Sequence, residues 1–282
     1  KEAEKNNAIV TVADGDEPVA ALDLYNFAKE LSFDVISIGK GKNNPFNTFA
    51  TPSSLTKEAS LKQMNPKMLT SFVDGTKTMV EMAALANFLG FNIDIDGMHG
   101  IEATYENINQ YYIPKKDGGL LEQSQVVDFA FGIAPGVFAV IYSEDDYVNY
   151  EMEYLKMGKG PYWTLARPYH LTSLEIPRTI RHVMLEKYSK LSAQSWNVEV
   201  VAHAKQDIEP GTNLGSIGGD YIYGKAQKTS SSKGLLPIGI AEDNVVTKAI
   251  AKGNPIAIDE VDAQDNELCE YWDYQNQILD SD

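Results

Sequence analysis

A strand, a helix and a second strand follow one another near the start of the chain, and this order restricts the fold more than any other feature. Residues 8–12 (AIVTV) and 33–38 (FDVISI) are apolar enough for buried strands. Between them, Asp16 can cap a helix that has Pro18 in its first turn, and apolar residues recur as far as Leu31. Such an alternation within roughly 30 residues is typical of a βαβ unit, so we expect the two strands to pair in parallel.

Further helix and strand signals continue up to residue 190. Capping residues, prolines and glycines delimit the segments. We expect helices over 53–62, from Asn65-Pro66, and over 76–89, 145–157 and 172–188, with two strands within 126–142. Ser53 or Ser54 would cap the first of these helices, and Pro177 would mark the true first turn of the last.

Residues 197–282 have a different texture, with short strands and many glycines, as in NVEVVAHAK and GSIGGDYIYGKAQ. This pattern indicates a small, mostly β module. We therefore predict an α/β (α+β) catalytic domain with a mixed sheet over residues 1–190, followed by the β-rich module and a C-terminal tail over 197–282. The stretch GKGKNN would form a loop at the carboxyl end of the strand at 33–38, where open α/β sheets bind ligands.

The balance of charge argues against some classes of partner. With 40 acidic and 24 basic residues, the chain has a net charge of −16 at pH 7, which repels phosphate backbones and argues against nucleic-acid binding. The sequence has no run of about 18 apolar residues, so we expect no membrane helix. The single cysteine, Cys269, excludes an intrachain disulfide and fits a reducing cytoplasm.

The stretch GKGKNN, residues 39–44, concentrates hydrogen-bonding groups on two glycines. Lys40 and Lys42 are suited to an anion, and Asn43 and Asn44 can donate to and accept from sugar hydroxyls. The glycines would let the backbone approach a ligand closely. A solvated turn is the alternative interpretation, because lysine, asparagine and glycine are all common in turns.

A second group of polar residues lies in DGTKT, where Asp74 is positioned to cap a helix. Lys77 then falls in the first helical turn, where the helix dipole disfavours a cation by roughly 0.3–1 kcal/mol. An anion bound by Thr76, Lys77 and the helix N-terminus would explain this placement. Glu81 lies one turn further on the same face, so a surface ion pair with Lys77 is the alternative interpretation.

A third group lies in RPYHLTSLE, residues 167–175. Arg167 offers a planar fork to a carboxylate or phosphate, His170 can exchange protons near neutral pH, and Glu175 can orient either of them. A lone histidine is more often structural than catalytic, but these three residues lie close together at a junction between elements.

The stretch DGMHG brings His99 close in sequence to Asp94 and Asp96. Carboxylates and imidazole suit magnesium or manganese. A plain turn is the alternative interpretation of this stretch.

The sequence contains none of the motifs GxGxxG, GxxxxGK[ST], GxSxG or HExxH. Long motifs nevertheless carry a resemblance to a known family: GKGKNNP, MNPKMLTSFVDGTKTMVEMAALAN, APGVFAV, MGKGPY and RPYHLTSLE. Together they resemble the homoserine-dehydrogenase-like oxidoreductases with a C-terminal SAF domain, and most closely the enzymes similar to 1-deoxyxylulose-5-phosphate reductoisomerase. The resemblance covers nearly the whole chain.

This resemblance implies an NADPH-dependent reductoisomerase of isoprenoid precursor biosynthesis, or an oxidoisomerase of carbohydrate metabolism that acts on branched sugar acids. It places a Rossmann NAD(P)-binding domain ahead of the matching stretch, so we expect the chain to begin inside a longer protein, with the ADGDEP turn near the join. The cofactor-binding residues would lie mostly in that preceding domain. The residues on family motifs facing the cleft would be Lys40, Lys42, Asn43, Asn44, Asp74, Lys77 and Arg167.

Chemistry then suggests roles for these side chains. Negative charge develops on oxygen when a carbon skeleton is rearranged, and lysines or a magnesium or manganese ion stabilise such charge. We predict catalytic roles for Lys42, Asp74, Lys77, Glu81 and His170, and substrate contacts for Lys40, Asn43, Asn44, Thr76 and Arg167.

The predicted protein is a cytoplasmic homo-oligomer that takes a small anionic sugar derivative and NADP, without nucleic acid or membrane partners. Two alternatives stay open at this point. One is a non-catalytic module for sugar-acid binding or oligomerisation, and the other is a homoserine dehydrogenase.

Overall fold

The computed structural model describes residues 2–187, 189–262 and 267–279. The chain divides into two compact units, each made of two segments. The first unit comprises Lys1–Asn43 and Glu81–Val198, and the second comprises Asn44–Val80 and Glu199–Asp282. The segment 44–80 thus shares a unit with the C-terminal module, and the division falls within helix α5 (Thr76–Leu89).

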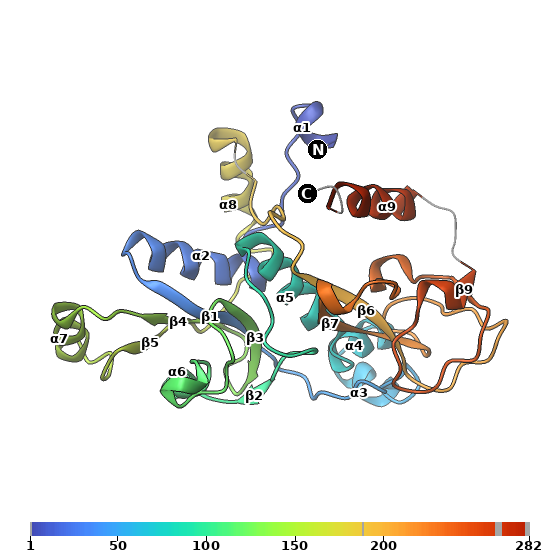
Figure 1. Cartoon of the computed structure of the whole chain (residues 1–282), viewed down its shortest axis with the longest axis horizontal. Coiled ribbons are helices and arrows are strands. Elements are labelled where there is room, and N and C mark those ends of the chain that lie inside the picture. The colour runs from blue at the N-terminus through green and yellow to red at the C-terminus, as the bar shows by residue number, and fades with distance from the viewer. Residues whose placement is uncertain (1, 188, 263–266, 280–282) are drawn as a thin grey trace. The chain divides into compact units, whose positions relative to one another are not determined.

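A five-stranded sheet in the order β2-β3-β1-β4-β5 forms the centre of the first unit (Figure 1). The strands are β1 (Asp34–Gly41), β2 (Ile101–Glu102), β3 (Val126–Phe131), β4 (Val137–Tyr142) and β5 (Tyr162–Arg167). Strand β1 pairs in parallel with β3 and antiparallel with β4, and β4 pairs antiparallel with β5. The sheet is therefore mixed, as predicted for an α/β catalytic domain.

The predicted strand at residues 8–12 is wrong. These residues form no strand, and Val10 is 71% exposed. The physical reason is that β1 already has both of its edges occupied, by β3 and β4, which leaves no place for an additional parallel neighbour. The segment instead runs beside residues 189–190, where the Lys190 backbone N–H donates to Thr11 Oγ1 at 2.8 Å.

The stretch GKGKNN also differs from the predicted loop, because its first three residues complete strand β1. A Cβ atom on Gly39 would lie 1.7 Å from the carbonyl oxygen of Asp128, and one on Gly41 would lie 2.4 Å from the nitrogen of Ala134. The neighbouring backbone therefore requires both glycines, whether or not a ligand is present. Lys40 therefore lies on a central strand rather than in a loop, between Phe129 of β3 and Val137 of β4.

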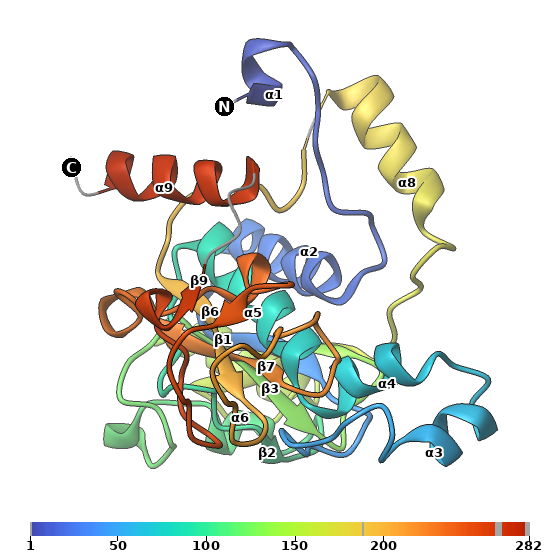
Figure 2. The same ribbon diagram turned by 90° about the vertical axis from the view of Figure 1, so that its right-hand side faces the viewer.

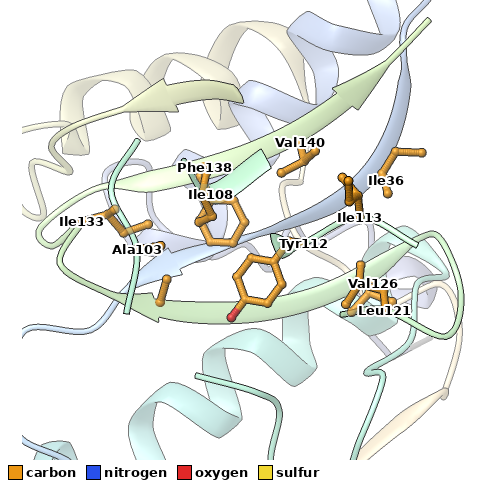
Figure 3. Close-up of a cluster of buried hydrophobic side chains, with 11 residues drawn as sticks. Ile36, Ala103, Ile108, Tyr112, Ile113, Leu121, Val126, Ile133, Phe138 and Val140 are labelled. Atoms are coloured by element: carbon orange, nitrogen blue, oxygen red, sulfur yellow. The ribbon is translucent and has the colours of Figure 1, made fainter. Parts of the chain in front are cut away.

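Helix α2 (Glu17–Glu30) packs on β1 and β4 and buries its residues from Pro18 to Leu22. A core cluster between the strands and the segment 101–121 is centred on Tyr112 (Figure 3). The Tyr112 ring stacks on Phe138 with centroids 5.5 Å apart and planes 4° apart. This packing fixes the central strands that carry the polar residues described below.

The second unit contains helices α3 (Thr56–Leu61) and α4 (Pro66–Val73), which Figure 2 shows next to each other, together with most of the C-terminal residues. Its further elements are β6 (Val198–Ala204), β7 (Ile222–Lys228), β8 (Val245–Val246), β9 (Val261–Asp262) and α9 (Glu267–Leu279). A small core of Ala50, Ala59, Leu69 and Val73 lies between α3 and α4. Among the described residues, the C-terminal part is thus β-rich up to β9 and helical after it.

Some of the helix starts predicted from the sequence have the expected capping residue, and one does not. Asn65 caps α4, since its side chain accepts from the Lys67 backbone N–H, and Asp145 caps α7 (Asp146–Tyr154) in the same way. Within the described ranges, α3 begins at Thr56 without a side-chain cap, because Ser54 instead bonds back to Thr51. The prediction of a cap from Ser53 or Ser54 was wrong.

Pro177 does lie in the first turn of α8 (Ile176–Arg181), which continues as a π-helical turn at His182–Glu186. The residue that ends the predicted helix, Tyr188, lies outside the described residues. The remaining elements are α1 (Glu2–Lys5), α6 (Ile108–Tyr111), and 3-10 turns at Lys115–Asp117, Thr229–Ser231, Ile238–Ile240 and Ile258–Glu260. No helix within the described ranges has the length and apolar character that crossing a bilayer requires.

Candidate functional site

The side chain of Lys40 is buried between carboxylates in the first unit. Lys40 is 4% exposed, its Nζ lies 2.8 Å from Glu17 Oε1, and it also pairs with Glu81. Glu17 begins α2 and Glu81 lies on α5, so strand β1 and two helices together build this group. Two of the predicted site residues, Lys40 and Glu81, are therefore in direct contact.

His170 joins the same group through Glu17. Its Nδ1 lies 3.0 Å from the carbonyl oxygen of Gly15, and its Nε2 lies 3.6 Å from Glu17 Oε1. Because a carbonyl oxygen only accepts, the ring donates to Gly15 through Nδ1, which leaves Nε2 facing Glu17. Lys40 Nζ and His170 Nε2 thus both face Oε1 of Glu17.

Asp16 belongs to this group as well, and it occupies the N-cap position of α2 as predicted. Among the described residues, α2 begins without a capping hydrogen bond from the Asp16 side chain. One carboxylate oxygen from each of Asp16, Glu17 and Glu81 lies within 4.8 Å of the others. With three carboxylates and the Lys40 ammonium, the group has a negative formal charge. We call Asp16, Glu17, Lys40 and Glu81 the carboxylate–lysine cluster.

Arg167 ends β5 and makes a buried ion pair with Glu175. Its guanidinium also lies 3.6 Å from Asp23 Oδ2 and over the ring of Tyr169, 4.9 Å from the centroid. Burial raises the pKa of Glu175, but hydrogen bonds from Arg167 and Arg178 outweigh it, so that the pKa lies below its ordinary value. Arg167 and Glu175, which were predicted to act together, are in contact.

A second buried lysine of the first unit, Lys190, pairs with Asp14 and Asp23 at 2.7 and 3.0 Å. Asp14 also accepts hydrogen bonds from the Thr179 hydroxyl and from the ring of His182. Burial raises the pKa of Asp14, but the bonds from Lys190, Thr179 and His182 outweigh burial and lower the pKa. This network ties the turn before α2 to the segment that follows β5.

Lys42 and Asn43 follow directly after β1. Lys42 is 5% exposed, and its backbone N–H donates to the Ala130 carbonyl at 2.8 Å. Asn43 is exposed. The strand therefore delivers Lys42 to the carboxyl end of β1 with its side chain buried.

Asp74 and Thr76 lie in the second unit, where they meet residues of the C-terminal module. Lys205 Nζ lies 2.8 Å from Asp74 Oδ2, and the two residues are 2% and 0% exposed. Asp74 Oδ1 accepts from the Thr76 backbone N–H at 2.9 Å, and Thr76 Oγ1 accepts from the Gly224 N–H at 2.8 Å. Burial lowers the pKa of Lys205, although Asp74 acts to raise it.

Lys77 and Asn44 are the other predicted residues of the second unit. Lys77 is half-buried, with its amine 5.5 Å from the centroid of the Phe72 ring. Asn44 Oδ1 accepts from Lys62 Nζ at 3.1 Å. Since Lys77 and the carboxylate–lysine cluster belong to different units, the convergence of the amines of residues 40, 42 and 77 stays a prediction.

His99 contacts Asp94, with its Nε2 2.8 Å from Oδ2, while Asp94 Oδ1 accepts from the Glu122 backbone N–H at 2.9 Å. The backbone N–H of His99 donates to Asp128, a fully buried carboxyl whose pKa burial raises despite this bond. The stretch thus forms a turn held by two carboxyl groups. Asp96 is exposed.

Glu17, Lys190 and Lys205 are polar residues in these contacts that the sequence patterns did not single out. The run DGDEP contained a signal for Glu17, because two acidic residues precede the proline of a helix start. His203 and Lys205 alternate with alanines in AHAK, a period-two pattern that favours a solvated face, yet both side chains are buried.

A mixed α/β sheet with buried ionisable groups at the carboxyl end of its central strand defines an enzyme-like domain, and comparison with protein families agrees. A family model of an oxidoreductase catalytic domain matches residues 15–176, more than half of the chain. The chain therefore belongs to the family described as oxidoreductase DRL, catalytic domain. The match includes the carboxylate–lysine cluster, Arg167 and His170, whereas Lys205 lies beyond it. No curated protein matches the sequence.

Proposed function

We propose that this oxidoreductase domain is the catalytic part of an NAD(P)H-dependent reductoisomerase or oxidoisomerase that acts on a small sugar phosphate or sugar acid. The observation that carries the proposal is the pair of buried lysines, Lys40 and Lys42, at the carboxyl end of β1. Burial of a cation is costly without a partner, and Lys40 has two carboxylate partners. The C-terminal module over 197–282 is, in this proposal, SAF-like.

The carboxylate–lysine cluster handles protons rather than the anionic end of the substrate. Its negative formal charge repels a phosphate or carboxylate, so the predicted contact between Lys40 and the substrate anion is unfavourable unless a second cation is present. Lys40 holds Glu17 and Glu81 in place, and Glu17 faces His170 Nε2. We assign the transfer of a proton to or from the substrate to His170 and Glu81.

Lys42 and Arg167 are assigned to the substrate anion. Lys42 is a point charge on a backbone position fixed by β3, while Arg167 offers a planar fork already oriented by Glu175. Negative charge that develops on a substrate oxygen would be stabilised by such prepositioned cations. Asn43, Asn44, Thr76 and Lys77 remain proposed contacts from the segment that follows β1 and from the start of α5.

The donor set of the cluster fits a divalent cation. Asp16, Glu17 and Glu81 supply carboxylate oxygens, which are the ligands that magnesium and manganese prefer. When bound there, such an ion would polarise a substrate oxygen as a Lewis acid. Lys40 pairs with two of these carboxylates, so its ammonium would compete with the ion for them. We propose NADP as the redox cofactor and assign no residue of this chain to it.

Kinetics of the full-length protein, including the proposed nucleotide-binding domain, test the assignment. NADPH consumption would be followed with 1-deoxyxylulose 5-phosphate and with branched sugar acids, and homoserine with NADP would serve as the competing reaction. We expect Lys42→Met to lower kcat/KM by about 100-fold or more, the typical cost of removing one group that stabilises a developing oxyanion. Lys159→Met, at an exposed lysine of the same unit, serves as the matched control.

Unchanged kinetics of Lys42→Met would contradict the assigned role. Turnover of homoserine alone would replace the proposed substrate class with the simpler dehydrogenase reaction. Binding of a sugar acid without turnover in the complete protein would support a non-catalytic module instead.

A further inference from the structure

A pocket of about 290 Å³ lies at the end of the first unit's sheet that is remote from Lys40. Its lining includes Asp34, Val35 and Ile36 at the amino end of β1, whereas Lys40 is near the carboxyl end of the same strand. All of the lining residues belong to the first unit. None of them belongs to the proposed catalytic set, so this pocket is separate from the site described above.

Two pairs of aromatic rings line this distal pocket. Tyr142 and Tyr162 lie with ring centroids 4.8 Å apart, and Tyr25 and Phe91 meet edge to face at 5.8 Å. The hydroxyls of the first pair are already engaged, because Tyr142 donates to Glu144 and Tyr162 donates to Asp117, each at 2.7 Å. These bonds hold the rings in place, so that the rings offer a ligand flat apolar surface rather than hydroxyl groups.

The backbone around the distal pocket is irregular at two points. The pairing of β1 with β4 shifts register between Val35 and Ser37, which is the signature of a β-bulge at Ile36. Gln125 adopts φ 63°, a left-handed conformation that is unusual for a residue other than glycine, and its N–H donates to the Ile36 carbonyl at 2.7 Å. Bulges and strained residues cluster at functional sites, and here both lie in the lining of one pocket.

The charges of the distal pocket balance. Lys29 and Lys116 contribute two positive charges, and Asp34 and Glu144 contribute two negative charges. Gln125 adds an amide that both donates and accepts hydrogen bonds. A lining with no net charge gives an anion no advantage, whereas it provides donors and acceptors for a ligand whose hydroxyls do both.

We propose that the distal pocket binds an uncharged polyol of monosaccharide size. The apolar C–H face of such a ligand stacks on the rings of Tyr142 and Tyr162, and its hydroxyls bond to Gln125, Lys116 and Glu144. The pocket volume lies near the lower limit of ordinary ligand sites, which fits a small ligand. This inference is independent of the proposed reaction, since it uses other residues and a ligand without charge.

Saturation-transfer NMR and titration calorimetry with D-xylose and with xylitol test the proposal on the full protein. We expect binding with a Kd in the millimolar range, the order typical of a small ligand with few contacts. Tyr162→Leu is expected to weaken binding at least tenfold by removing one stacking face, while Tyr150→Leu, at a tyrosine 65% exposed on α7, leaves binding unchanged. Thermal unfolding of each variant checks that it is folded.

Lys116→Ala provides a second variant, at an exposed position where the fold does not depend on the side chain, and it is expected to weaken binding several-fold. Lys40→Met separates the two sites, because polyol binding should persist in it. The proposal is overturned if xylitol shows no saturation transfer, or if a folded Tyr162→Leu binds as tightly as the original protein. Loss of polyol binding in Lys40→Met, or displacement of xylitol by inorganic phosphate, would also overturn it.

Discussion

Lys40 of the first unit lies on strand β1 and Lys205 of the second directly follows strand β6; both lysines are buried, but their partners differ. Lys40 pairs with Glu17 and Glu81, with Asp16 beside them, so acidic groups outnumber the ammonium. Lys205 pairs with Asp74 and donates to the Gly219 carbonyl at 2.8 Å, so one positive and one negative charge balance. Lys40 thus lies among three acidic residues, whereas the Lys205 pair joins one acidic and one basic side chain.

We propose that this difference separates a functional group from a structural one. When a balanced ion pair is buried, both charges lose their hydration, and the attraction between them compensates for this cost if the geometry is good. Such a pair serves mainly to hold segments together. A cluster with unbalanced charge is costly unless it binds a cation or transfers protons. Burial lowers the pKa of Lys205, which shows that this lysine is strongly desolvated even with Asp74 as its partner.

Removal of Lys205 should produce the largest effect. Lys205→Met leaves the Asp74 carboxylate, which is 0% exposed, without its counter-ion. We expect the free energy of unfolding to fall by about 3–5 kcal/mol, the usual cost of breaking a buried pair from one side. Urea denaturation followed by circular dichroism measures the loss.

The double variant Lys205→Met with Asp74→Asn is the control for this prediction. Asparagine keeps an oxygen that accepts from the Thr76 N–H but carries no charge. The double variant should recover more than half of the stability lost in the single one. A double variant as unstable as Lys205→Met would show that the loss does not come from the unpaired charge.

Removal of Lys40 should have a smaller effect on stability and a specific effect on metal binding. We expect Lys40→Met to cost about 1–3 kcal/mol, because Glu17 keeps His170 nearby and both glutamates retain some exposure. Loss of the ammonium should strengthen Mn²⁺ binding at least tenfold, since the three carboxylates would then face the ion without competition from the Lys40 ammonium. Electron paramagnetic resonance of free Mn²⁺ measures the affinity.

Glu81→Gln in the Lys40→Met background should abolish the gained Mn²⁺ binding, because it removes one of the three carboxylates. Equal Mn²⁺ affinities of the original protein and Lys40→Met would show that the cluster is not a cation site. The difference between Lys40 and Lys205 would then be one of structure only.

The smallest expected effect concerns Asp14, the partner of Lys190, whose contribution to stability should depend on pH. The pKa of Asp14 is lowered in the folded protein, so its contribution to stability is present above its ordinary pKa of 3.8 and is lost as the pH falls through the folded value. The difference in unfolding free energy between the original protein and Asp14→Asn should therefore shrink below about pH 3.8. A difference between the original protein and Asp14→Asn that stays constant down to pH 2 would contradict the prediction.

Local signals in the sequence predicted those parts of the fold that depend on local chemistry. Asn65 and Asp145 cap their helices, and Gly90, with φ 71°, follows the end of α5 as expected. Residues 8–12 were predicted to be a strand because they are apolar, but a strand needs a free edge, and β1 has none. Edge occupancy is a property of the whole sheet, which no short window of sequence contains.

Contacts between distant residues of the candidate site were predictable to different degrees. Arg167 and Glu175 are close in sequence, so their pairing followed from spacing. Lys40 and Glu81 were both singled out, but their contact depends on how α5 packs on β1. The partnership of Asp74 with Lys205 could not be inferred, because nothing in either local pattern points to the other.

The composition of the second unit from two separated segments also bears on how this protein is made. Residues 44–80 leave the ribosome long before residues 199–282, yet Asp74 has its charge balanced by Lys205 and Thr76 binds the backbone of Gly224. The start of α5 therefore cannot reach its final state until the residues around Lys205 and Gly224 have also been synthesised. A nascent chain stalled before residue 199 would expose this helix start to chaperones, so the folding of residues 44–80 depends on synthesis of the C-terminal module.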